Sequence, residues 1–120
     1  MQVITTHFNA DFDCLASMMA AKKLYPEAHM VLPGSAEGLV EEFLKEQSPL
    51  LEFTRIKDIP LEQVKLLVVV DTHTPEMIGV FAPLMDNPSV EVHLYDHHPE
   101  SEIKVNQAGI KKRGASTTIL

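Results

Sequence analysis

Short runs of aliphatic and β-branched residues alternate along this chain with stretches of helical spacing. The strongest run, residues 65–70 (KLLVVV), ends at an acid, which favours a central parallel strand covered on both faces. Three further runs, at 3–6, 29–32 and 90–95, have the residue types of strands. Weaker strand candidates lie at residues 51–53 and 103–105.

Helical patterns fill the gaps between these strands. Residues 15–24 carry apolar side chains three and four positions apart, and Met18 and Met19 are expected to fill the core. Residues 36–47 repeat the pattern, and Thr74 followed by proline is typical of a helix start. This alternation predicts an α/β fold, a three-layer arrangement around an open, mostly parallel sheet.

Composition narrows the class of protein. The chain has 120 residues and a formal net charge of −7, with 10 Lys and Arg against 17 Asp and Glu, and its length suits one domain. The acidic balance argues against a general nucleic-acid-binding surface, but a phosphate substrate remains compatible if metal ions supply positive charge. One cysteine excludes an internal disulfide and fits a reducing compartment, so we expect a cytoplasmic protein without membrane association.

Acidic and histidine side chains gather where three predicted strands end. Because the carboxyl ends of parallel strands share one edge of a sheet, these side chains should converge there. Several carboxylates in one place repel one another unless some are protonated or a cation lies among them. The candidates are His7, Asp11, Asp13, Asp71, Asp96, His97 and His98.

This set of imidazoles and carboxylates suits Mn²⁺, Mg²⁺, Co²⁺ or Zn²⁺ in a hydrolytic role. Seven candidates exceed the number of protein ligands that one small cation takes, so two ions are expected. Two ions about 3.5–4 Å apart form the arrangement that promotes in-line attack on phosphorus.

The order of these motifs resembles the DHH phosphoesterase family, which includes RecJ-like exonucleases, nanoRNases and manganese-dependent pyrophosphatases. The matching elements are HFNADFD at 7–13, the acid Asp71 after an apolar strand, Asp-His-His at 96–98 and GASTT at 114–118. Within the family, HFNADFDCLASMMAAKKLYP and VLPGS are most similar to DHH domains fused to CBS domains and to a tRNA nucleotidyltransferase or poly(A) polymerase module.

The resemblance implies that five of these residues bind two metal ions, and that Mn²⁺ is the favoured metal. His7 and Asp11 would bind one ion, and Asp13 and His97 the other. Asp71 would bridge the two.

The resemblance also implies residues that act on the substrate. Asp96 would orient a histidine, and His98 would contact the scissile phosphate or act as a general acid. Asn9 would shape the turn between the ligands, while Ser116 and Thr117 would bind phosphate at a helix start.

Plainer roles compete for some of these residues. Asp11 or Asp13 could simply cap a helix, and His97 and His98 could belong to a surface turn. Cys14, beside Asp13, invites a redox or metal role, but at the start of an apolar helix face it is most readily interpreted as a small buried residue.

The implied activity is two-metal hydrolysis of a phosphate ester or anhydride in a nucleotide, short oligonucleotide or polyphosphate-like substrate. The alternative is a non-catalytic, nucleotide-sensing or regulatory DHH module of a multidomain RNA-processing protein. The family has a further aspartate ligand and a C-terminal substrate domain that residues 1–120 do not match. We therefore expect the N-terminal part of a truncated catalytic domain, inactive alone, followed by further domains, and able to form homo-oligomers through an exposed sheet edge.

Overall fold

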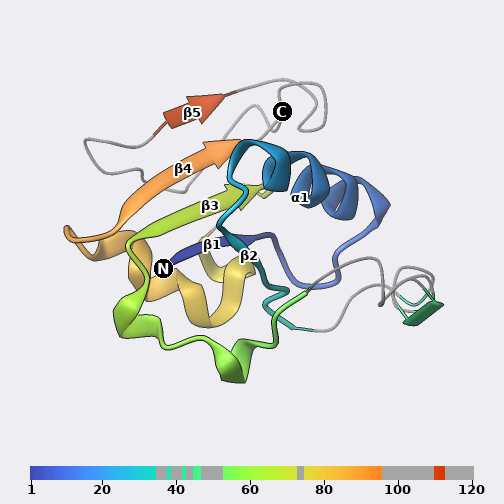
Figure 1. The fold of residues 1–120 in the computed structure, drawn as a ribbon, viewed down its shortest axis with the longest axis horizontal. Helices are drawn as coiled ribbons and strands as arrows, with labels where there is room; N and C mark the ends of the chain where they lie inside the picture. Colours follow the sequence, from blue (N-terminus) through green and yellow to red (C-terminus); the bar gives the residue numbers. More distant parts are fainter. Residues whose placement is uncertain are drawn as a thin grey trace.

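The computed structural model describes residues 1–34, 53–72, 75–95 and 110–112, together with single helical positions at 38, 42, 45 and 46. Within these ranges the regular elements are strands, one α-helix and three 3₁₀ segments (Figure 1). The strands are β1 (Gln2–Thr5), β2 (His29–Met30), β3 (Leu66–Val70), β4 (Glu91–Tyr95) and β5 (Ile110–Lys112). The helical elements are α1 (Phe12–Leu24), η1 (Ile56–Asp58), η2 (Leu61–Gln63) and η3 (Pro75–Asp86).

The five strands form one sheet in the order β2-β1-β3-β4-β5, and every pairing is parallel. The predicted α/β fold with a mostly parallel sheet is therefore confirmed. Because β2 and β3 lie on opposite sides of β1, the chain changes direction across the sheet between them. In open α/β sheets, ligands bind beyond the carboxyl ends of the strands at such a reversal.

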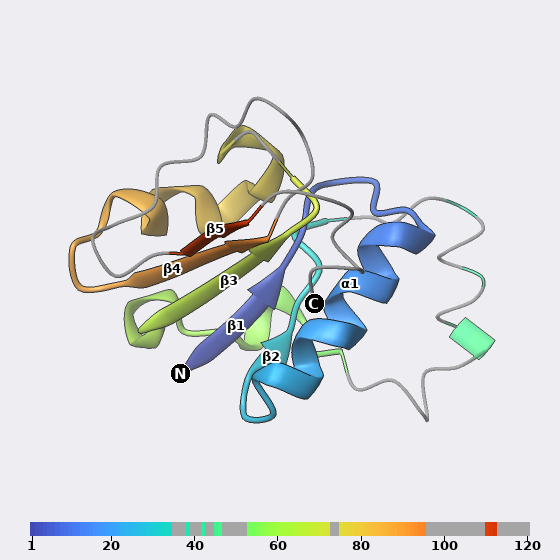
Figure 2. The ribbon, with the colours of Figure 1, turned by 90° about the horizontal axis from the view of Figure 1, so that it is seen from above.

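Both faces of the sheet are covered among the described residues. Alternate strand residues point to opposite faces, so Ile4 packs with Met18 of α1, while its neighbour Val3 packs with Phe81 of η3. Figure 2 shows α1 on one side of the strands and η3 on the other. Coverage on both faces explains why β3 is apolar along nearly its whole length. Its residues 67–70 are all fully buried.

The packed face of α1 differs in part from the expected one. Met18 is fully buried as predicted, but Met19 is 38% exposed, so its assignment to the core was wrong. The buried residues of the helix include Cys14, Met18 and Ala21, which lie three and four positions apart along one face. Met19 is one position past that face and points towards solvent.

The helix expected after Thr74 is a 3₁₀ segment, η3, broken at Gly79, where φ is 60° and ψ is −127°. Pro83 also lies inside this segment and cannot donate a backbone hydrogen bond. Most of the helix predicted at 36–47 and the strand at 103–105 lie outside the described residues. Of the strand predicted at 51–53, Phe53 is described, and it forms a parallel bridge with Met30.

None of the helices in the described part of the chain has the length and apolar character needed to cross a membrane.

The loop after β1 is anchored by Phe8. Its backbone N–H donates to the carbonyl oxygen of Met77 at 2.8 Å. Its ring lies against Gly34 and Gly79, where an added Cβ would come within 2.7 Å and 2.8 Å of ring carbons. The two glycines thus provide the space that seats Phe8, and this seat places the residue before it, His7.

We predict that Gly79→Ala destabilises the fold by about 2 kcal/mol or more, because a Cβ is strained at this backbone conformation and also meets the Phe8 ring. Urea unfolding measures the change. Gly38→Ala is the matched control, since a Cβ there has nothing within 4 Å and alanine favours a helix. Equal stability of Gly79→Ala and the parent protein would contradict the described seat of Phe8.

Candidate metal centre

The carboxyl ends of β1 and β3 are tied together by a buried hydroxyl. Thr6 is fully buried, and its Oγ1 donates to the carbonyl oxygen of Val70 at 2.7 Å. On the other side of β3, the backbone N–H of Asp71 donates to the carbonyl oxygen of Tyr95 at 2.9 Å. These bonds hold His7 and Asp71 at the same edge of the sheet, although they are far apart in sequence.

Three side chains meet at this edge. The Sγ of Cys14 lies 3.0 Å from Nε2 of His7 and 3.2 Å from Oδ2 of Asp71. One potential ligand atom from each of the three residues lies within 4.8 Å of the other two, which is close enough for a single metal ion to contact all of them. His7 is partly buried, whereas Cys14 is fully buried and Asp71 is 3% exposed. The site therefore opens on the side of His7.

Asp11 holds the start of α1 beside this group. It is the N-cap residue, and its Oδ1 accepts the backbone N–H of Cys14 at 3.0 Å. Partial burial, the largest influence, acts to raise the pKa of Asp11, but hydrogen bonds from Cys14 and the nearby His7 together lower it below its usual value. The carboxylate is thus held in its ionised form next to His7.

Burial also governs the Cys14 thiol. It raises the pKa of Cys14 far above its ordinary value, and the nearby Thr6 side chain and the backbone at the start of α1 only partly oppose this rise. The neighbouring Asp71 carboxylate acts in the same direction as burial. In the absence of a cation, the protonated thiol is therefore the stable form.

The backbone is unusual at the same edge. Asn9, with φ of 54°, and Asp71, with φ of 55°, are the non-glycine residues with positive φ among the described residues. Asparagine and aspartate tolerate this left-handed conformation better than most residues, and such positions cluster at functional sites. The turn role predicted for Asn9 agrees with this conformation, while its part in substrate binding stays a prediction.

The structure brings together some of the predicted site residues. His7 and Asp71 converge as expected, and Asp11 lies beside His7. Asp13 is in the first turn of α1 and exposed, and it is not part of the compact group. The remaining candidates, Asp96, His97, His98, Ser116 and Thr117, lie outside the described residues, and their roles stay predictions.

Sequence reasoning set aside a metal role for Cys14 in favour of simple burial. Its burial was expected and is confirmed, but its thiol also lies between two predicted metal ligands. The available signal was its position three residues after a helix-capping acid, in the first turn of a helix that starts beside His7.

A second polar group lies farther back along β4. The hydroxyl of Tyr25 lies 2.8 Å from both Nδ1 of His93 and the hydroxyl of Tyr95. Nε2 of His93 is 2.8 Å from Oε2 of Glu91. Both ring nitrogens of His93 thus have partners within the fold, which indicates a structural role for this histidine.

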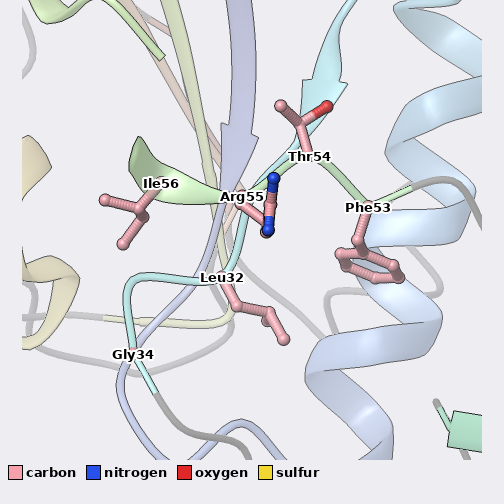
Figure 3. Close-up of a pocket in the computed structure, with 6 residues that line it drawn as sticks. All are labelled: Leu32, Gly34, Phe53, Thr54, Arg55 and Ile56. Atoms are coloured by element: carbon pink, nitrogen blue, oxygen red, sulfur yellow. The ribbon is translucent and has the colours of Figure 1, made fainter. Parts of the chain in front are cut away.

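A cavity of about 330 Å³ lies beyond the carboxyl end of β2 (Figure 3). Its apolar walls include Leu32, Phe53 and Ile56, and Gly34 closes it on the side of the Phe8 seat. The guanidinium of Arg55, which also lines it, pairs with Asp58 at 3.3 Å. The cavity shares none of the three converging side chains of the candidate metal centre.

Comparison with known proteins shows which family the chain belongs to. A family model described as "DHH family, N-terminal domain" matches residues 2–119. An A-adding tRNA nucleotidyltransferase of Geobacter sulfurreducens is 50% identical over 123 residues, covering 100% of this chain and 14% of that protein. A protein of the same name from Aquifex aeolicus is 31% identical over 121 residues, covering 99% and 13%. The chain thus spans only a small part of the length of these relatives.

We predict that Asp11→Ala lowers the free energy of unfolding by about 1 kcal/mol, because the N–H of Cys14 loses its acceptor. Asp11→Asn keeps an acceptor oxygen and should stay within about 0.5 kcal/mol of the parent. Urea unfolding without added metal measures both, with the exposed Glu27→Ala as the control. If the alanine and asparagine variants are equally stable, Asp11 does not act as the cap.

Proposed function

Since the chain belongs to the DHH family, we propose that the carboxyl edge of its sheet binds two divalent cations, with Mn²⁺ favoured, and hydrolyses a phosphate ester or anhydride. The substrate class is a nucleotide, a short oligonucleotide or a polyphosphate-like chain. The observation that supports this most directly is the convergence of His7 and Asp71 at the point where the strand order reverses.

The chemistry of the donor set fits such ions. The Nδ1 of His7 is within hydrogen-bonding reach of the carbonyl oxygen of Phe8, which favours a ring with the proton on Nδ1 and a lone pair on Nε2. That lone pair lies on the same side as the Asp71 carboxylate. Bound divalent cations would supply positive charge to a phosphate and activate a water molecule.

The protein's own contribution is the positioning of these side chains. The seat of Phe8 between two glycines fixes the carbonyl that orients His7. The cap made by Asp11 fixes the start of α1, and the left-handed backbone of Asp71 directs its carboxylate at the strand end. In this proposal Asp11 and Asp13 complete the ligand set from the helix side. His97, which follows β4 in the sequence, is a further ligand, while Asp96 and His98 act on the substrate.

A regulatory module is the second candidate. Both relatives bear the name of a tRNA nucleotidyltransferase, and this chain matches only 14% and 13% of them. A domain fused to such an enzyme could sense a nucleotide without hydrolysing it. In either case we propose a cytoplasmic, multidomain protein involved in RNA processing.

We predict that the complete protein containing this sequence hydrolyses at least one of a nucleotide, an oligonucleotide and a polyphosphate when Mn²⁺ is present. Asp71→Asn should lower the rate by about 100-fold or more, because an amide is a poorer metal ligand than a carboxylate. Phosphate release at varied Mn²⁺ concentration measures this.

Asp58→Asn is the matched control, since Asp58 is an exposed acid paired with Arg55 and lies outside the group of converging ligands. It should leave the rate within about twofold of the parent. Nucleotide binding without turnover would favour the regulatory module, and hydrolysis that does not respond to Mn²⁺ or to Asp71→Asn would contradict the proposal.

A further inference from the structure

The thiol of Cys14 has no role in the proposed Mn²⁺ ligand set, although it lies between two members of that set. Its sulfur is the atom that touches both His7 Nε2 and Asp71 Oδ2, at 3.0 Å and 3.2 Å. It is fully buried, and it is the chain's single cysteine.

The sulfur of Cys14 faces an imidazole nitrogen and a carboxylate oxygen at the same time. A thiol carries one hydrogen, yet Cys14 faces two groups that can accept it. The Nδ1 of His7 faces the carbonyl oxygen of Phe8, so its Nε2 is the ring nitrogen that faces the sulfur. One nitrogen, one sulfur and one oxygen atom from three side chains thus lie together, which is the arrangement of a metal ligand set.

The three ligand atoms lie somewhat closer together than a bound ion requires. Zinc lies about 2.0–2.1 Å from histidine nitrogen and about 2.3 Å from cysteine sulfur, so neighbouring ligand atoms in a tetrahedral site are roughly 3.6 Å apart. The sulfur contacts of 3.0 Å and 3.2 Å are about half an ångström shorter. A small outward shift of the three side chains would therefore admit the ion.

We propose that His7, Cys14 and Asp71 form a three-ligand site for a thiophilic divalent cation such as Zn²⁺, with an open fourth position. The inference rests on the proposed function, because His7 and Asp71 also belong to the Mn²⁺ set. When Zn²⁺ binds, a zinc–sulfur bond forms and the thiol proton passes to solvent. Soft thiolate ligands favour zinc over manganese, so Zn²⁺ bound in this way competes with Mn²⁺ and inhibits the hydrolysis.

The surroundings explain why the thiol needs a cation to act as a ligand. The full burial of the sulfur and its contact with the Asp71 carboxylate both oppose a negative charge on it. Cys14 lies in the first turn of α1, so the positive end of the helix favours a negative charge on the sulfur. This effect offsets only part of the opposition from burial and from Asp71. A divalent cation between sulfur and carboxylate removes the remaining repulsion.

Co²⁺ provides a direct optical test, because a cobalt–thiolate bond gives a strong charge-transfer absorption in the near ultraviolet. The complete, metal-free protein is titrated with Co²⁺, and then with Zn²⁺ and Mn²⁺ in competition. We expect the thiolate absorption in the parent protein and its loss in Cys14→Ser and Cys14→Ala. The ratio of Zn²⁺ to Mn²⁺ affinity should fall at least tenfold in both variants. Met18→Leu, a change at a fully buried neighbour on α1, should retain the absorption.

Co²⁺ binding without thiolate absorption, failure of Co²⁺ to bind, or an unchanged affinity ratio in the variants would overturn the inference. If both variants unfold, zinc X-ray absorption of the parent protein decides, since a sulfur ligand at about 2.3 Å is distinct from nitrogen and oxygen at about 2.0–2.1 Å. Mn²⁺-dependent hydrolysis without a thiolate ligand would overturn this inference alone. A thiolate ligand without hydrolysis would overturn the proposed hydrolase function alone.

Discussion

The parallel pairing of β1 with β3 is the constraint on which the site depends. Its register, from Gln2 opposite Leu66 to Thr5 opposite Val69, brings both strands to the same edge. A shift of one residue would turn the buried face of β1 towards the wrong layer, so burial on both faces specifies the register strongly. Because of this pairing, His7 and Asp71 need only a few residues of loop to meet.

The loops at that edge are held by contacts outside the ligand group. The ring of Phe8 fills the space left by two glycines, and its N–H is bonded to the start of η3. Asn9 and Asp71 adopt left-handed backbone angles that such anchoring can maintain. The fold thus stores local strain at the site and offsets it with packing around it.

Charge and chemical softness then set what the site can bind. In the proposed function, cations offset the net charge of −7 near a phosphate, and the carboxylates at the strand ends would be their ligands. In the proposed three-ligand site, the thiol of Cys14 would add a soft ligand to an otherwise hard set. The same pocket would therefore distinguish manganese from zinc by whether the sulfur takes part.

Much of the fold followed from the sequence alone, because the apolar run of β3 and the polar residues after each strand depend on local pattern and on the geometry of any parallel sheet. These patterns predicted the α/β class, the parallel strands and the convergence of His7 with Asp71. They did not predict the exposure of Met19, the break of η3 at Gly79 or the place of the Cys14 thiol. These three features depend on which side of α1 and which side of η3 pack against the sheet. Only the tertiary structure decides this, since several helical phases bury a similar amount of apolar surface.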